Sequence, residues 1–259
     1  MAFEIYYRVR DYFKFSIREQ KELLISAILF GFILSFRMWG GKEFDALTGI
    51  KNLIIASIFI LIVLVWHISW QKIFSLNEGY RTHYHWWFPG ILISLFIAFI
   101  TYGYVPFLYP GHSYYEFMKR LRLGRFRYGI NIKDLVVPAV AGVISSVVLA
   151  LLMSFVYLAT KSYWVLFFIK LNFLYAFLSM LPIPRIEGIR MGGGSTVGFY
   201  IFFFGRPLYV FMLISLILYA WFVYYATTVL GSFLLLLLAM ILGLIVMFVF
   251  LKVVEKVVW

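Results

Sequence analysis

Long apolar stretches constrain this chain more than any other feature of its sequence. No charged residue occurs from Pro207 to Leu251, although about 20 apolar residues suffice to cross a membrane as one helix. Hydrophobic residues make up 64% of the chain and charged residues 13%, which excludes a soluble globular domain. We therefore expect an all-α polytopic membrane protein, in which region 207–252 folds as a helical hairpin that breaks near 227–232.

The other apolar stretches complete a prediction of about six transmembrane helices in a single integral membrane domain, 23–259. Without an internal repeat or linker, one domain is the simplest account. Segment 1–22 alternates bulky apolar and basic residues at helical spacing. It predicts an amphipathic helix on the membrane surface, with a partner-binding arm as the alternative. The remaining predicted spans are 23–39, 52–71, 135–160 and 163–182.

Segment 86–110 is apolar but contains prolines and glycines, and a basic loop, 116–134, follows it. A full crossing would place that loop opposite the basic N-terminal segment, against the tendency of Lys and Arg to stay in the cytoplasm. We therefore predict that 86–110 is a re-entrant hairpin, which is tolerated where protein covers it. The same charge rule places the N-terminus in the cytoplasm of a multi-pass protein of the cell membrane.

The net charge of +12 and the absence of cysteine narrow the possible partners. In a membrane protein such a charge favours contact with anionic membrane lipids and argues against nucleic acid. Without cysteine there is no thiolate nucleophile and no cysteine-ligated metal. Lys170 stands alone as a charge inside an expected span, where it needs an acceptor, a partner or a water-lined cavity.

The end of the expected fourth span carries a motif. After Ser179, the sequence Leu181–Gly188 places two prolines before Arg185, Glu187 and a glycine. This stretch resembles the motif N-x-x-P-x-P-x-L-D-G of the site-2 protease family of intramembrane zinc metalloproteases, with Ser179 at the Asn position and Glu187 at the Asp position.

The resemblance extends over about 50–200, and 79–87, 105–112 and 141–146 resemble further segments of archaeal family members. It implies that the family's H-E-x-x-H zinc helix falls at His67–Gln71. Here Ile68 replaces the general base and Gln71 replaces the second histidine. An aliphatic side chain cannot move a proton, and a neutral amide is a poor zinc ligand. The former zinc positions are then His67, Gln71 and Glu187.

Two hypotheses follow for that site. In the first, no cofactor is expected, and a cluster of charges fills the former metal cavity, with Arg185 or Lys72 neutralising Glu187. That cluster comprises Lys72, Arg185, Glu187 and Arg190. In the second, an unconventional zinc site forms from His67, His83, His85 and Glu187.

We expect a catalytically inactive relative of site-2 proteases that binds a transmembrane helix of a client or partner protein. It would act as an adaptor, a chaperone or a subunit of a membrane complex. One alternative is an active metalloprotease with rearranged zinc ligands. Another, suggested by Lys170 and the re-entrant segment, is a transporter-like or channel-like subunit.

Overall fold

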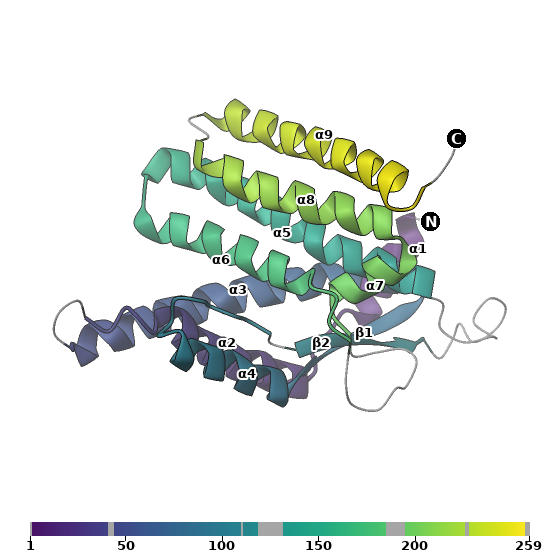
Figure 1. Ribbon diagram of the computed structural model, residues 1–259. Coiled ribbons are helices and arrows are strands. Elements are labelled where there is room, and N and C mark those ends of the chain that lie inside the picture. Colours follow the sequence, from purple (N-terminus) through teal and green to yellow (C-terminus); the bar gives the residue numbers. More distant parts are fainter. Residues whose placement is uncertain are drawn as a thin grey trace.

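The computed structural model describes residues 2–40, 44–109, 111–118, 132–184, 195–225 and 228–256. These residues are mostly helical, and they include a two-stranded antiparallel sheet that an all-α prediction does not contain. Figure 1 shows α5, α6, α8 and α9 stacked together, with α2, α3, α4 and the sheet packed beside them. The elements are α1 (Ala2–Tyr12), α2 (Ile17–Ser35), α3 (Ala46–Glu78), β1 (Tyr80–Trp86), α4 (Phe88–Ile100), β2 (Gly111–Phe117), α5 (Ile132–Thr160), α6 (Tyr163–Ser179), α7 (Val197–Phe204), α8 (Arg206–Phe222), a 3-10 turn (Val223–Tyr225) and α9 (Val229–Val253).

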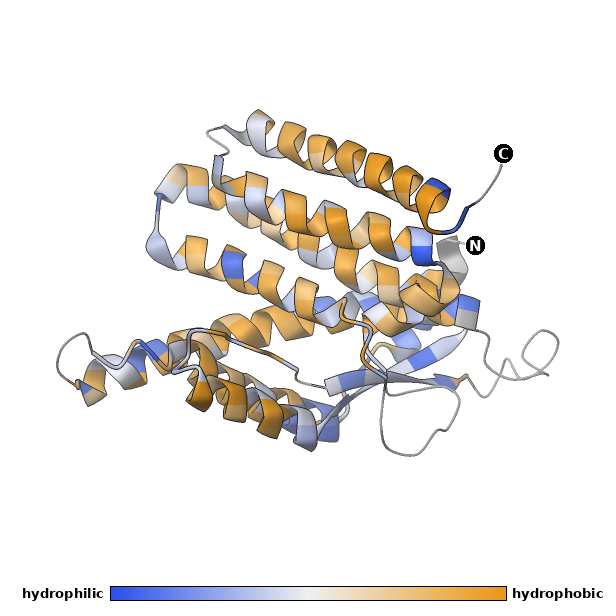
Figure 2. Cartoon of the chain, viewed as in Figure 1, coloured by the Kyte–Doolittle hydropathy of each residue, from blue (hydrophilic) through white to orange (hydrophobic). Residues whose placement is uncertain are grey.

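Three helices of the described chain are long and apolar enough to cross a membrane: α3, α5 over Lys133–Thr160, and α9 over Leu230–Val253. Shorter apolar helices are α4, α6 and α8. Figure 2 shows hydrophobic residues along most of these helices and hydrophilic ones gathered near the sheet and at helix ends. These lengths and compositions support a helical membrane protein.

The N-terminal segment is two helices, so the prediction of one surface helix over 1–22 is wrong. The cause is a capping box at Ser16. Its side chain accepts from the Glu19 backbone N–H, and the Glu19 carboxylate accepts from the Ser16 N–H. This reciprocal cap starts a new helix after Tyr12. As a result α2 begins at Ile17, before the predicted first span.

The segment between the two strands leaves the sheet as α4 and returns beside its starting point. It reverses through left-handed backbone at Tyr102 (φ 54°) and Gly103 (φ 71°). Trp86 at the end of β1 then pairs with Gly111 at the start of β2. This register confirms the hairpin path predicted for 86–110, and its depth in a membrane stays a prediction.

The C-terminal region contains the predicted hairpin, with α8 packed along α9. The break falls between Phe222 and Val229, close to the predicted 227–232. A short helix, α7, precedes the hairpin and was not predicted. Its first turn lies so close to the end of α6 that a Cβ on Gly198 would meet the Met180 carbonyl oxygen.

Candidate functional site

A small cavity lies among α3, β2, α6 and the start of α7, beside His67. Its volume is about 30 Å³, enough for one or two water molecules at roughly 10–15 Å³ each. The structure brings together here three positions of the predicted motif: His67, Gln71 and Ser179. The other polar residues that line the cavity are Tyr84, Tyr109, His112, Ser113, Tyr115, Tyr175, Ser195, Thr196 and Tyr200.

A chain of hydrogen bonds ties His67 and Gln71 to β2 and α5. Ser113 Oγ donates to Gln71 Oε1 at 2.6 Å, and Gln71 Nε2 lies 3.0 Å from His67 Nε2. On the other side of the ring, His67 Nδ1 lies 3.0 Å from Ser146 Oγ, which is 3.3 Å from the Gly142 carbonyl oxygen.

The donors in this chain fix the state of the imidazole. The Gln71 amide nitrogen can only donate, so His67 Nε2 must accept and must carry no proton. Nδ1 then carries the proton and donates to Ser146, whose hydroxyl donates to the Gly142 carbonyl. Every member of the chain is satisfied with a neutral histidine, as a buried polar group requires.

Gly142 lets α5 approach this chain. A Cβ at this position would lie 2.8 Å from both Gln71 Nε2 and His67 Nε2. Just beyond it, the Ser146 carbonyl accepts from the Asn172 side chain on α6. The polar chain therefore connects β2, α3, α5 and α6 through side chains that are almost fully buried, except Ser113, which is half-buried.

The described residues do not fit a zinc ion at this place. Zinc needs the lone pair of an unprotonated ring nitrogen, but the Nε2 lone pair of His67 accepts the Gln71 amide. Ile68 offers no ligand and packs into the apolar core with 1% exposure. In the part of the chain that the structure describes, no three His, Asp or Glu side chains gather closely enough to hold a metal. Glu187 lies outside that part.

The alternative ligand set is also separated. His85 Nδ1 binds the Glu22 carboxylate at 2.8 Å, while His83 stacks on Tyr114 and lies 3.8 Å from Glu116. Both histidines lie on one face of β1, since 81, 83 and 85 alternate with the buried 80, 82 and 84. Neither His83 nor His85 lines the cavity beside His67.

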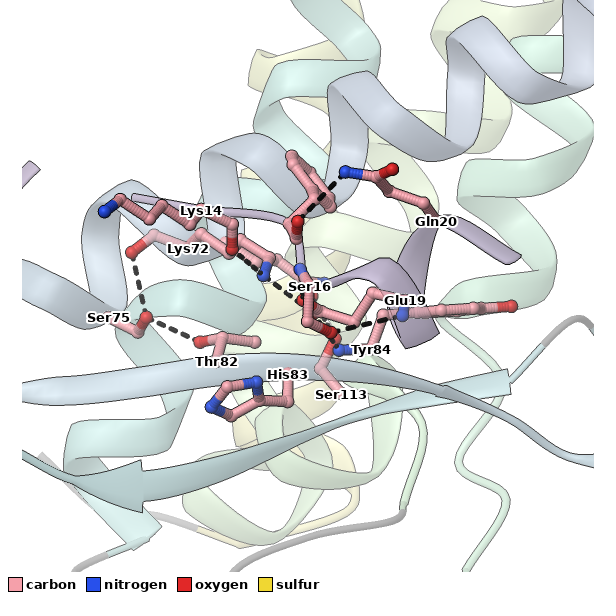
Figure 3. A network of polar contacts seen from close by, with 12 residues as sticks. Lys14, Ser16, Glu19, Gln20, Lys72, Ser75, Thr82, His83, Tyr84 and Ser113 are labelled. Atoms are coloured by element: carbon pink, nitrogen blue, oxygen red, sulfur yellow. Dashed lines mark hydrogen bonds and ion pairs between the residues drawn. The ribbon is translucent and has the colours of Figure 1, made fainter. Parts of the chain in front are cut away.

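Lys72 has a partner other than the predicted one. Its ammonium forms a buried ion pair with Glu19 at 2.7 Å and donates to the Lys14 carbonyl, as Figure 3 shows. Glu19 therefore already holds this cation, and because Glu187 lies outside the described residues, its neutralisation by Lys72 or Arg185 stays a prediction. The other members of that predicted cluster, Arg185, Glu187 and Arg190, lie outside the described residues.

Two carboxylates of α2 cover the outer edge of β1. Glu19 accepts from the Tyr84 N–H at 2.9 Å, and Glu22 accepts from the Trp86 N–H at 3.1 Å. Burial raises the pKa of Glu19, but the hydrogen bonds from Lys72, Tyr84 and Ser16 outweigh burial and leave that pKa below its usual value. These two N–H groups are not available to another strand, so the edge is covered at Tyr84 and Trp86.

The opposite edge of the sheet borders the cavity. Because Tyr84 and Trp86 direct their N–H groups away from β2, their partners Ser113 and Gly111 direct theirs away from β1. Gly111, Ser113 and Tyr115 all line the cavity. Within the described residues no backbone group pairs with this edge of β2. It is an open strand edge beside His67 and Gln71.

Thr196 closes the cavity from the side of α7. Its Oγ1 accepts from the Ile183 and Phe199 N–H groups at 3.0 and 3.3 Å and donates to the Leu181 carbonyl. Thr196 therefore caps α7 and holds the Leu-Pro-Ile segment that follows α6. Ser179, at the position of the family's Asn, donates to the Ala176 carbonyl at 2.8 Å within its own helix.

Lys170 lies on α6 with an exposed side chain, between the buried Ile169 and Leu171. Asn172 points into the core to Ser146 and so does not pair with it. An ammonium on the outer face of an apolar helix is costly in a membrane. The prediction of a partner contact at Lys170 stays a prediction.

Sequence reasoning missed Glu19, Glu22, Ser113 and Thr196. A signal existed for Glu19, because Ser-x-x-Glu before an apolar run marks a capping box. A signal also existed for Thr196, a threonine placed before an apolar segment. Glu22 and Ser113 act through contacts distant in sequence, for which no local signal exists.

Comparison with protein-family models, with curated proteins and with solved structures found no match.

Proposed function

We propose that this protein is a non-hydrolytic membrane protein, similar in plan to site-2 proteases, that binds a membrane segment of a client or partner protein. It would serve as an adaptor, a chaperone or a complex subunit. The observation that carries this proposal is the hydrogen-bonded chain Ser113–Gln71–His67–Ser146. It occupies the place where the resemblance puts a metal and its water.

The described cavity lacks the carboxylate base of a metallohydrolase, although a second imidazole, His112, also lines it. Peptide hydrolysis needs a base for the attacking water, and no described Asp or Glu lines the cavity. His67 already accepts from Gln71 and donates to Ser146. Using its Nε2 as a base would require breaking the buried hydrogen bond from Gln71.

The open edge of β2 supports a binding role. An extended segment can add to such an edge through backbone hydrogen bonds, with neighbouring pockets giving specificity. Glu19 and Glu22 cover the β1 edge at Tyr84 and Trp86, whereas no described backbone group pairs with the β2 edge beside the cavity. A locally unwound client segment would satisfy the outward groups of Ser113 and Tyr115 beside the cavity.

The proposal includes a topology. We propose about six spans, with α4 and its return forming a re-entrant hairpin and with the N-terminus in the cytoplasm of the cell membrane. The sheet would then lie at the cytoplasmic ends of the spans, where the basic segments gather.

Zinc analysis of the purified protein tests the absence of hydrolysis. We expect far less than one zinc per chain and no cleavage of co-expressed single-span membrane proteins. One tightly bound zinc per chain, lost together with cleavage in His67→Ala, would establish the metalloprotease instead.

A pair of variants at one position tests the binding edge. Ser113→Pro removes the outward N–H, whereas Ser113→Ala removes only the hydroxyl that binds Gln71. We expect a crosslinker at Glu116 to capture an intact membrane protein from cells with the wild type and with Ser113→Ala. Capture should be lost with Ser113→Pro, and equal capture by both variants would refute docking at this edge. A crosslinker at Tyr163, exposed at the start of α6, serves as the positional control.

A further inference from the structure

A second and larger pocket lies beside the start of β1, separate from the cavity that contains His67. It has a volume of about 510 Å³ and is bounded by the segment between α1 and α2, the end of α3 and the start of β1. No described residue of the cavity beside His67 takes part in it. The charged residues that line this pocket are Asp11, Lys14, Glu19, Lys72 and Arg81.

The two acids of the pocket are already neutralised. Glu19 pairs with Lys72 at 2.7 Å, and Asp11 pairs with Arg10 at 3.2 Å. Lys14 and Arg81 remain as the excess positive charge. In the part of the chain that the structure describes, neither forms an ion pair.

Arg81 is held in place, but not all of its hydrogen-bond donors have an acceptor among the described residues. Its guanidinium lies over the Tyr12 ring, 4.2 Å from the centroid, which fixes the orientation of the side chain. Its Nε is buried and has no hydrogen-bond partner among the described residues. A buried donor without an acceptor is costly, and a planar guanidinium matches the oxygens of a phosphate group.

The pocket lies where lipid headgroups would be found. A helix of 33 residues, as α3 is, extends about 50 Å at a rise of ~1.5 Å per residue. The hydrocarbon core is about 30 Å thick, so the end of α3 that bounds the pocket reaches the headgroup region. Arg8 fastens α1 to that end through the Leu76 and Asn77 carbonyls, both at 3.0 Å.

The outer surface of the same region carries large apolar and aromatic side chains beside its charges. Tyr6 and Tyr7 on α1 are exposed by 64% and 52%, and Ile17 at the start of α2 by 73%. Aromatic side chains of this kind favour the boundary between acyl chains and headgroups. A phosphate bound in the pocket would have apolar surface beside it for the acyl chains, which a free phosphate ion does not need.

We propose that this pocket binds the phosphate of an anionic phospholipid, with Arg81 and Lys14 as its cationic ligands. The guanidinium of Arg81 supplies the oriented hydrogen bonds. Lys14, exposed at the mouth, supplies the second charge. The site would fix the N-terminal helix to the membrane surface.

Lipid titration of the full-length, detergent-solubilised protein by native mass spectrometry tests this proposal. The probes are phosphatidylglycerol, neutral phosphatidylcholine and inorganic phosphate as competitor. We expect one phosphatidylglycerol per chain that phosphatidylcholine does not replace. The double variant Arg81→Gln/Lys14→Gln should weaken it by about tenfold or more, because two charge-assisted contacts are lost.

Lys21→Gln is the matched control. It removes one positive charge, against two in the double variant and one in Lys14→Gln, from an exposed position on α2 that does not line the pocket, and it should change the affinity by less than about twofold. If it weakens binding as much as the double variant, the attraction is diffuse and the proposed site is refuted.

Two further outcomes decide the remaining points. Should inorganic phosphate displace the lipid at concentrations near its own physiological range, the site binds free phosphate and the lipid assignment is overturned. Should Arg81→Gln not fold, Lys14→Gln alone carries the test, because Lys14 is exposed. Unchanged lipid affinity in that variant would overturn its role as a ligand.

Discussion

Replacing Gly142 with alanine tests the polar chain around His67 most directly. The new Cβ would lie 2.8 Å from both Gln71 Nε2 and His67 Nε2. Both side chains are almost fully buried, with 2% and 1% exposure, and hydrogen bonds hold them on their far sides. Either α5 must move away from α3, or the hydrogen bonds that link Gln71, His67 and Ser146 must break.

The expected cost combines three contributions. Overpacking a close contact costs about 1–3 kcal/mol, and each broken buried hydrogen bond costs about 1 kcal/mol. The higher helix propensity of alanine offsets about 1 kcal/mol of this destabilisation. We therefore expect Gly142→Ala to lower the free energy of unfolding by about 2 kcal/mol. For a chain of this size that corresponds to roughly 4–8 °C in the melting temperature.

Thermal unfolding in detergent, followed by tryptophan fluorescence, measures this loss. Gly205→Ala is the control, because the nearest atom to its Cβ would be 3.9 Å away, and it should stay within about 0.5 kcal/mol of the wild type. In a Gln71→Ala background, Gly142→Ala should cost at least about 0.5 kcal/mol less, as coupled neighbours do. An equal loss in both backgrounds, or none in either, would refute the close approach.

Three further predictions concern the rest of the structure. Glu19→Gln should cost about 3 kcal/mol at neutral pH by stranding Lys72. Since the folded-state pKa of Glu19 is lowered, its contribution to stability is present above the usual value of 4.5 and disappears as the pH falls below it. The variant should therefore lose less stability on acidification to pH 4 than the wild type. A parallel loss in both proteins would contradict the pairing. Thr196→Val should lower the free energy of unfolding by about 1–2 kcal/mol through loss of the α7 cap, whereas Ser162→Ala, at a helix start without a side-chain cap, should not. In this cysteine-free chain, single cysteines at positions 116 and 122 should react with a membrane-impermeant reagent from the same side, and labelling of 122 from the outside only would overturn the topology.

The fold was predictable wherever one helix could be read by itself. The uncharged run after Pro207 required a hairpin, because one span cannot hold it, and α8 and α9 confirm this. The basic loop that follows 86–110 favoured a return of this segment to its starting side, and the pairing of Trp86 with Gly111 brings its two ends together. The division at Ser16 was missed because hydrophobic periodicity continues across it, while the capping box that decides the matter is a polar signal.

The candidate site was predictable in its positions and not in its contacts. The resemblance placed His67, Gln71 and Ser179 in one site, and the structure brings them to one cavity. The partner of Lys72 was not predictable, because Glu19 is 53 residues away in sequence. A carboxylate in a capping box is assigned to its own helix start by local rules, and only the packing of α2 on α3 gives it a second role.

The presence of His67 at one position of the zinc motif is weak evidence that this protein carries out zinc-dependent hydrolysis. His67 is the residue that accepts from one neighbour and donates to another across three elements, which neither an aliphatic side chain nor a cation can do. Gln71 at the next turn supplies the donor that a second histidine would not supply while bound to a metal. Ile68 fills core space that a carboxylate could occupy only with a partner. These three residues are consistent with one another as parts of a packed polar chain. Ile68→Glu would bury a carboxylate for which no described partner is at hand, and Gln71→His would remove the amide that binds both Ser113 and His67, so neither substitution would fit this arrangement.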